Sequence, residues 1–558
     1  MLKNRLILLF TVIFIATILD VDALYTGQQD IMRISREGSH HDNSNNNKTI
    51  LFLPLDERFT TRFLFLNLAS LSKFNIVTPD IEFISQWKTS ANLTYIDEWI
   101  ENNLGKTDII LFSAEMYLYG GLIRSRISDD STDAILQRLE KLVQYKTRYP
   151  NLRIYVSSVV MRIPAYSLNF EEPDYWGTYG LNLYQYSFYQ DRFNQLHNIS
   201  DLVQAQKWLN TVPKDIVNNF LWRRARNHNV SVEMLNYQHN SSVFEQLYIT
   251  LDDNAEYGFN IRESQELKDL VSQYKLDNSV HIYPGADEVG LTMLSKVSLD
   301  SFAPSTPSRF LVIYRNTSTQ NLIPNYEGQP MNLTILEQIK GAGGILANGS
   351  RPDDYDILLL VNNFDTVPQT EAPNQPPVNT RSFGEFDVFI PYIQGAVQNN
   401  KIVGFADNRY SNGGDQLLYH WICKIAAPGA AGSLISLGQL TYAGWNTDGN
   451  KLGTVISNSV ILSLFQSSQK NEWFQLYRFL EDIDYQSDVR QQLTAYVGQV
   501  STDSINNLAI DLAFYERFVW KLLNTRLTNL VEEFQLPYKL SSIYFPWKRS
   551  FEIGMIIA

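Results

Sequence analysis

Two adjacent carboxylates, Asp252 and Asp253, follow a short apolar segment in the stretch YITLDDNAEYGFN (248–260). Two carboxylates that lie close together cannot both ionise readily, so the pKa of one rises and that group can donate a proton. Glycoside hydrolysis uses carboxylates in pairs. In substrate-assisted hydrolysis of N-acetylhexosamines, one acid polarises the acetamido group and the other protonates the leaving oxygen. We predict that Asp252 and Asp253 are the catalytic pair. Ligand binding, metal ligation and the capping of a loop are the alternatives.

Polar residues also follow most of the other apolar segments and occur in the loop YAGWNTDGNKLG. The predicted substrate-binding residues are Asp56, Glu57, Arg58, Glu115, Tyr119, Arg162, Tyr257, Asp287, Glu288, Asp407, Asn408, Arg409, Trp445 and Asn446. Carboxylates can supply a general acid and stabilise an oxocarbenium-like transition state. Amides and arginine can bind hydroxyl groups, and aromatic faces can receive a sugar ring. The set predicts an acidic, amide-rich cleft for a carbohydrate.

The stretch YPGADEVG (283–290) has two interpretations. A tight turn at Pro284-Gly285 would present Asp287 and Glu288 to the cleft. Alternatively, Asp287 is the N-cap of a helix, which is a purely structural role.

A metal site has weak support in the sequence. The segment ADNRYSNGGD (406–415) is rich in oxygen ligands, but it lacks the alternating spacing of a calcium loop. The seven histidines form no His-x-x-x-His motif and no Cys/His cluster, which argues against zinc. We predict no cofactor, and an oxygen-ligated Ca²⁺ or Mg²⁺ site is the alternative.

The elements that must position these residues are short apolar strands. Eight such segments lie at 50–58, 108–121, 153–162, 247–253, 280–288, 309–316, 356–364 and 401–410. Their near-continuous apolar character favours parallel strands covered on both faces. Amphipathic helical patterns alternate with them, which indicates an α/β fold. We expect a (β/α)₈-barrel-like domain first and two doubly wound α/β domains second. In both, ligands bind at the carboxyl ends of the strands.

The length of 558 residues exceeds what one hydrophobic core usually holds. We predict a signal peptide over 1–23 and a disordered Asn-rich leader over 24–49. An α/β domain with most of the acidic strand ends follows over 50–305. A second α/β segment over 306–455 either completes the same barrel or stands apart, and 456–558 is helical with a final strand.

The first residues have the pattern of a secretory signal. Lys3 and Arg5 precede an apolar run, and small residues end at Ala23. The apolar run is shorter than the roughly 20 residues that span a bilayer, so we predict cleavage, no stable membrane anchor, and secretion or delivery to a lysosome-like or vacuole-like lumen. Predicted glycosylation sites are Asn47, Asn92, Asn198, Asn229, Asn240, Asn316, Asn332 and Asn348.

The charge of the chain limits the classes of partner that it can bind. The net charge is −13 and the pI is about 5.1, which disfavours nucleic acid and anionic membranes. The single cysteine, Cys423, excludes an intrachain disulfide. Its apolar, helix-like surroundings predict a buried, inert thiol.

Several strings together resemble a known family. They are LPLDER, YLYGGLIRSR, RRARNH, LDDNAEYG, PGADEVG, GWNTDGNKLGT and FPWKRSFE. They are similar in content and order to domain of unknown function 4127, a mostly bacterial and often secreted family, over roughly residues 50 to 553. Bacterial members usually have aspartate where this chain has Glu115. The resemblance implies a shared architecture without implying an activity.

We predict a secreted glycosidase-like hydrolase that acts on N-acetylhexosamine-containing glycans. A non-catalytic carbohydrate-binding protein and an oxygen-ligated, metal-dependent hydrolase are the alternatives.

Overall fold

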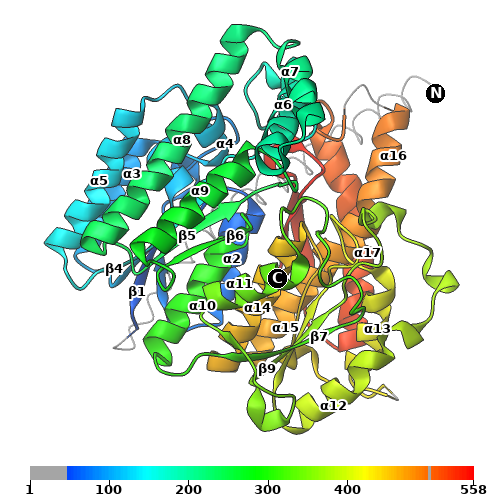
Figure 1. The fold of residues 1–558 in the computed structure, drawn as a ribbon. Coiled ribbons are helices and arrows are strands. Elements are labelled where there is room, and N and C mark those ends of the chain that lie inside the picture. The colour runs from blue at the N-terminus through cyan, green and yellow to red at the C-terminus, as the bar shows by residue number, and fades with distance from the viewer. Residues whose placement is uncertain (1–46, 431, 501–503) are drawn as a thin grey trace, which may run out of the picture.

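The computed structural model describes residues 47–430, 432–500 and 504–558. The predicted signal peptide and residues 24–46 of the leader lie outside these ranges. The strands form two separate parallel sheets and one antiparallel hairpin (Figure 1). The first sheet contains β1 (Thr49–Leu53), β2 (Asn75–Val77), β3 (Ile109–Ser113), β4 (Arg153–Val160), β5 (Gln246–Leu251) and β6 (Val280–Pro284). The second contains β7 (Arg309–Tyr314), β8 (Ile345–Leu346), β9 (Ile357–Val361), β10 (Ile402–Ala406) and β11 (Leu440–Ala443).

The first sheet has the strand order β2-β1-β3-β4-β5-β6 and carries helices on both faces. The helices that cover it are α2 (Leu64–Ser70), α3 (Leu93–Leu104), α5 (Thr132–Arg148), α8 (Lys214–Ser241), α9 (Phe259–Tyr274) and α10 (Val289–Phe302). Successive strand side chains point to opposite faces. Leu51 and Ile110 therefore pack with α3, α5, α8 and α9, whereas Phe52 and Leu111 pack with α2 and α10.

The second sheet has the order β11-β10-β9-β7-β8 and is covered in the same way. Its helices are α11 (Met331–Gly341), α12 (Ile390–Gln398), α13 (Gln416–Ala426) and α14 (Asp448–Phe465). Leu359 shares a core with α11 and α14, and Leu358 packs with α12 and α13 on the other face.

The expectation of a (β/α)₈ barrel is wrong, because the described strands form two open sheets and no closed barrel. All eight predicted segments contain strands, but β2, β8 and β11 were not predicted. These three short strands lie at sheet edges. In each sheet, the strand that comes first in the sequence lies between the second and the third. The fourth and fifth strands follow beyond the third. This is the order of doubly wound folds, which was the second expectation.

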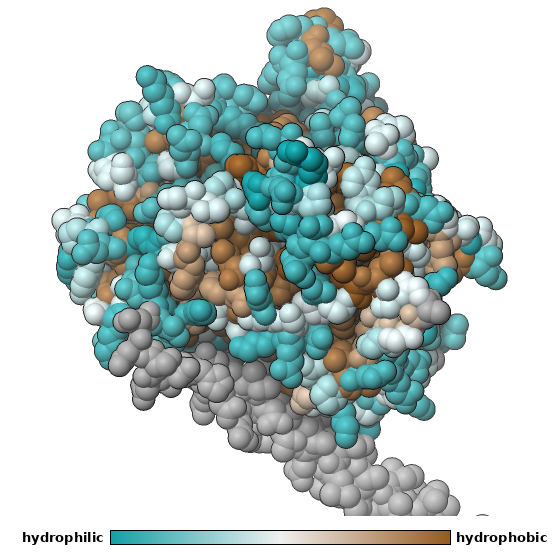
Figure 2. Space-filling view, turned by 90° about the horizontal axis from the view of Figure 1, so that it is seen from below, coloured by the Kyte–Doolittle hydropathy of each residue, from teal (hydrophilic) through white to brown (hydrophobic). Residues whose placement is uncertain are grey.

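The two sheets share one continuous hydrophobic core. Phe52 and Tyr248 of the first sheet belong to the same buried cluster as Leu358 and Phe405 of the second. The helix α10 packs against α14, and α11 packs against β6. Figure 1 shows these helices in the middle of the molecule, between the two sheets. On the face shown in Figure 2, hydrophilic side chains dominate and apolar ones form patches between them.

The rest of the chain is mainly helical. The remaining helices are α4 (Leu122–Ile127), α6 (Trp176–Leu196), α7 (Ile199–Leu209), α15 (Ser468–Phe479), α16 (Arg490–Val500) and α17 (Leu512–Phe534). No helix in the described ranges is long and apolar enough to cross a membrane. The predicted final strand is a hairpin of β12 (Leu540–Tyr544) and β13 (Gly554–Ile557). Cys423 is buried as predicted, and burial raises the pKa of its thiol.

The predicted glycosylation sites all reach the surface. Asn316 is half-buried and the other seven asparagines are exposed. Asn92 and Asn198 also act as N-caps, because their side chains accept hydrogen bonds at the starts of α3 and α7. Glycosylation itself stays a prediction.

A hydrogen bond from Tyr248 links the first sheet to α11 in the second half of the chain, and its removal tests how much this contact stabilises the fold. The buried hydroxyl of Tyr248 donates a hydrogen bond of 2.8 Å to the carbonyl of Gly341 at the end of α11. Removing this hydroxyl leaves a buried carbonyl unpaired, which costs about 1–3 kcal/mol. Tyr248→Phe should therefore lower the thermal unfolding midpoint.

The matched control is Tyr274→Phe. Its half-buried hydroxyl bonds to Asn236 within the first half of the chain, so a smaller effect is expected. Equal midpoints for wild type and Tyr248→Phe, measured by calorimetry, would show that this bond does not stabilise the fold.

Candidate active site

A continuous ionic network lies at the carboxyl edge of the first sheet. It consists of four arginines and seven carboxylates: Arg58, Arg126, Arg162, Arg549, Asp56, Glu171, Glu172, Asp252, Asp253, Asp287 and Glu552. They come from the loops after β1, β4, β5 and β6, from α4 and from the segment between β12 and β13. The topology therefore brings distant parts of the chain to one place, as expected where parallel strands end.

Arg58 forms the inner end of this network. Its guanidinium lies 2.8 Å from Asp56, 2.6 Å from Asp287 and 3.6 Å from Glu552. It also stacks on Trp547, with 4.5 Å to the ring centroid. Asp287 therefore pairs with an arginine and does not cap α10, whose N-cap residue is Glu288. This supports the inward-facing interpretation of the stretch 283–290.

Arg126 and Arg162 form the outer end, where they bind Asp252 and Asp253. Arg126 pairs with Asp252 at 2.6 Å. Arg162 is in contact with Asp253 and lies 3.8 Å from Asp252. Both adjacent carboxylates thus approach one guanidinium, because the chain turns after β5 and Asp253 has a left-handed backbone with φ of 37°. Such conformations are uncommon for residues other than glycine and concentrate at functional sites.

Glu171 and Glu172 connect the two ends. Glu171 lies 3.0 Å from both Arg126 and Arg162, and it also contacts Arg549. Arg549 in turn pairs with Glu552 at 2.9 Å. Since every charge has a partner, the network can be buried without leaving an isolated ion.

The network opens to solvent at the predicted catalytic pair. The side chain of Asp253 is 28% exposed and that of Asp252 is 17% exposed, whereas that of Glu171 is 12% exposed and those of the arginines are at most 7%. Partial burial, followed by the negative charge of Asp252, raises the pKa of Asp253 to about 6. Asp253 is therefore the group that can both reach a ligand and hold a proton near neutral pH.

A loop from the second half of the chain lies beside this opening. The backbone N–H of Asn254 donates to the carbonyl of Tyr326 at 2.7 Å. The Tyr326 side chain is 40% exposed, and its hydroxyl donates to Glu371 at 2.7 Å. On the other side, the hydroxyl of Tyr166 lies 2.6 Å from Arg162. The opening is thus bordered by aromatic residues from both halves.

Glu57 lies behind the network rather than at its opening. Its carboxylate accepts hydrogen bonds from the Trp87 backbone at 2.6 Å, from Ser85 at 2.7 Å and from the Trp547 indole at 2.6 Å. Burial, and then the charge of Asp56, raise the pKa of Glu57 to about 7. Glu57 holds Trp547 against Arg58 and so positions the network.

Glu115 and Tyr119 do not join the network. Glu115 accepts from the Val159 backbone at 2.7 Å and from Ser113 at 2.9 Å, and burial raises its pKa. It fixes the ends of β3 and β4. Tyr119 is buried against the guanidinium of Arg226.

A second polar network lies at the carboxyl ends of the second sheet. Asp407 accepts from Asn362 at 2.9 Å and from Tyr442 at 2.8 Å, and burial followed by the charge of Asp415 raises its pKa to about 6. Arg409 pairs with Asp365 at 2.7 Å. Polar residues at the predicted strand ends therefore form two hydrogen-bonded networks, one at each sheet.

The other predicted residues have packing or hydrogen-bond partners outside the ionic network. Trp445 is 1% exposed and packs on Phe551, so its face is closed to a sugar ring. Glu288 accepts from Gln338, Asn408 donates to the backbone of Asp448, and the carbonyl of Asn446 accepts from Asn412. Tyr257 packs edge-on against Phe188.

Sequence reasoning missed five members of the network: Arg126, Glu171, Glu172, Arg549 and Glu552. Arg126 lies in the string YLYGGLIRSR, and Arg549 and Glu552 lie in FPWKRSFE. Both strings were noted without assigning roles to these residues. Glu171 and Glu172 form an acidic doublet like Asp252 and Asp253, which was a usable signal.

The side chains do not suggest a metal centre. Within the described ranges, no group of three or more His, Cys, Asp or Glu residues is arranged to hold a metal ion. The guanidinium groups occupy the positions next to the carboxylates.

Substitution of Arg549 measures how much the ionic network contributes to the stability of the fold. Arg549→Met keeps an unbranched side chain of similar length but leaves the buried carboxylates Glu552 and Glu171 without this partner. Removing one member of a buried pair costs about 3–5 kcal/mol, so the thermal midpoint should fall clearly.

The control is Arg351→Met, which removes an exposed arginine paired with Asp354. Exposed pairs contribute little, so its midpoint should match that of wild type. Similar midpoints for both variants would contradict the structural importance of the network.

The comparisons with known proteins identify a family but no activity. A family model described as "Protein of unknown function (DUF4127)" matches residues 50–555. No curated protein and no solved structure matches the chain. The matched range covers both sheets, the ionic network and most of the C-terminal hairpin. The chain therefore belongs to the DUF4127 family.

Proposed function

We propose that the protein is a glycosidase-like hydrolase that uses Asp253 as its general acid and Asp252 as the neighbouring anion. The observation that carries this proposal is the partly exposed pair of carboxylates at one guanidinium, one of them with a pKa raised to about 6. Two adjacent carboxylates with different environments are the arrangement by which one group stays protonated and the other stays charged.

The two carboxylates would divide the reaction between them. Asp253 would donate its proton to the leaving glycosidic oxygen as the bond from that oxygen to the anomeric carbon breaks. Asp252, paired with Arg126, would stay ionised and stabilise the positive charge that develops on the sugar, or polarise an acetamido group that attacks the anomeric carbon. Water would complete the hydrolysis.

The charge of the network favours a neutral substrate with a cationic transition state. Its seven carboxylates outnumber its four arginines, so the opening has an excess of negative charge. An anionic ligand would be repelled there, whereas an oxocarbenium-like transition state would be stabilised. We propose neutral glycans, and N-acetylhexosamine-containing ones in particular, as the substrate class.

The ion pairs also support a second candidate, a non-catalytic carbohydrate-binding protein. Asp252 and Asp253 are each bound by an arginine. Such pairing would also orient the two carboxylates as hydrogen-bond acceptors for the hydroxyl groups of a bound sugar. For either candidate, the basic and apolar N-terminal sequence and the eight surface sequons support our proposal of secretion or a lumenal location.

Substitution of the pair separates the two candidates. A panel of aryl glycosides, N-acetylated sugars included, should contain a substrate that wild type hydrolyses. Asp253→Asn and Asp252→Asn should then lower kcat/KM by about 10²- to 10⁴-fold, because each removes a group that acts in the transition state.

The control is Asp269→Asn, which changes an exposed carboxylate on α9 and should retain full activity. Full activity in Asp253→Asn would exclude the acid role. A panel in which ligands bind and none is cleaved would favour the binding protein.

The pH profile gives an independent test. A general acid works only while protonated, so kcat/KM should fall as the pH rises through about 6, the pKa of Asp253. In Asp252→Asn, the residual activity should fall at a lower pH, because the negative charge that raises this pKa has been removed. A descending limb that does not move in Asp252→Asn would contradict the pairing of the two carboxylates.

A further inference from the structure

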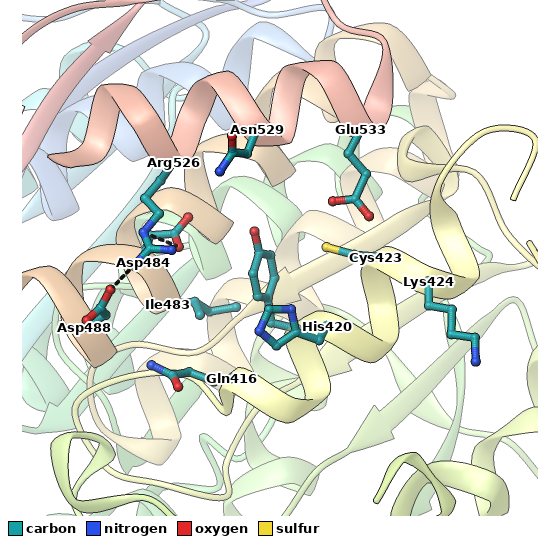
Figure 3. Close-up of a pocket in the computed structure, with 11 residues that line it drawn as sticks. Gln416, His420, Cys423, Lys424, Ile483, Asp484, Asp488, Arg526, Asn529 and Glu533 are labelled. Atoms are coloured by element: carbon teal, nitrogen blue, oxygen red, sulfur yellow. Dashed lines mark hydrogen bonds and ion pairs between the residues drawn. The ribbon is translucent and has the colours of Figure 1, made fainter. Parts of the chain in front are cut away.

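A cavity of about 720 Å³ lies outside the ionic network, between α13, the π-helical segment Leu480–Val489 and α17 (Figure 3). Its lining includes Tyr419, Cys423, Asp484, Asp488, Arg526 and Glu533. The volume is in the range of small-molecule sites, and no role proposed above uses these residues.

The feature that points to a ligand is the carboxylate of Asp484. Asp484 is 7% exposed, and its Oδ2 atom has no hydrogen-bond partner among the described residues. Arg526 approaches only the other oxygen, at 4.0 Å, and forms its close ion pair with Asp488. Burial raises the pKa of Asp484 to about 7, so a cationic group in the cavity would stabilise its ionised carboxylate.

The cavity is negatively charged. The carboxylates of Asp484, Asp488 and Glu533 line it, and Arg526 lies beside the first two (Figure 3). Lys424 points away from the other labelled side chains, and its ammonium lies 5.4 Å from the ring centroid of Phe383. Burial lowers the pKa of His420 below its ordinary 6.5, so the imidazole is mainly neutral at pH 7 and adds little positive charge.

Asp484 and Glu533 lie at opposite sides of the cavity (Figure 3). Arg526, which marks the end near Asp484, and Glu533 are seven residues apart on α17, which corresponds to about 10 Å along the helix axis. Asn529 lies between them, and the side chains of Ile483 and Cys423 provide apolar surface (Figure 3). This arrangement matches an extended molecule with a positive charge at each end.

We propose that this cavity binds a linear organic cation with an ammonium group at each end, the class of the aliphatic polyamines. One ammonium pairs with the carboxylate of Asp484 and the other pairs with Glu533. The alkyl chain lies along Ile483 and Cys423. The proposal is independent of any activity at Asp252 and Asp253.

Spermidine is the probe for this site. Isothermal titration calorimetry of the full chain at pH 7 and low salt should show saturable binding of one spermidine per protein. N1,N8-diacetylspermidine has the same chain and neutral ends, so its binding should be at least about tenfold weaker, because charge-assisted hydrogen bonds are lost. Equal affinity for the two compounds, or no saturable binding of spermidine, would overturn the proposal.

Two substitutions locate the binding. Asp484→Asn preserves the shape of the side chain and should weaken spermidine binding about tenfold or more. Glu533→Gln should weaken binding too. Because Glu533 is exposed, this variant should fold, and it therefore tests the site even if Asp484→Asn does not fold. Asp215→Asn, at an exposed position in the first turn of α8, should bind as wild type does. Unchanged affinity in Glu533→Gln and in a folded Asp484→Asn would place spermidine elsewhere and refute the site.

Discussion

The guanidinium of Arg58 is bound by carboxylates from three distant parts of the chain: Asp56 beside it, Asp287 after β6, and Glu552 near the C-terminus. An unpaired charge at this depth costs several kcal/mol. The buried position of Arg58 is therefore stable only when the last strand of the first sheet and the C-terminal hairpin are in place. The stability of the fold and the assembly of the network are thus linked.

The C-terminal segment is consequently part of the site. Trp547 lies between Arg58 and Arg549, with each guanidinium carbon 4.5 Å from its ring centroid. Cation–π contacts of this kind hold the guanidinium planes in fixed orientations, and Glu57 fixes the indole through its N–H. Arg549 then reaches Glu171, which contacts both arginines at the proposed catalytic pair. A continuous series of contacts thus connects Glu57 with Asp252 and Asp253.

The sequence predicted the α/β class, the apolar segments and the carboxylates that follow them, because these depend on local patterns. It did not predict β2, β8 and β11, which have two to four residues and lie at sheet edges. The eight predicted segments match the strand number of a (β/α)₈ barrel, but their pairing in two open sheets depends on contacts between distant parts of the chain. Arg126 and Arg549 were missed for a related reason. A helix and a C-terminal loop carry them, and only tertiary packing brings them next to the strand ends.

The two sheets share the same strand order over five strands, and both end in polar residues at their carboxyl edges. The types of residue at the two edges therefore do not show which edge holds the proposed active site. Solvent access distinguishes them, because a substrate must touch the group that donates the proton. Asp407 and Asn408 of the second sheet are completely buried, whereas the Asp253 side chain is 28% exposed. Where the second network reaches solvent, its carboxylates Asp365 and Glu385 pair with arginines that lower their pKa. The pKa of Asp253 is raised instead, and this difference supports our proposal that the chemistry lies at the first sheet.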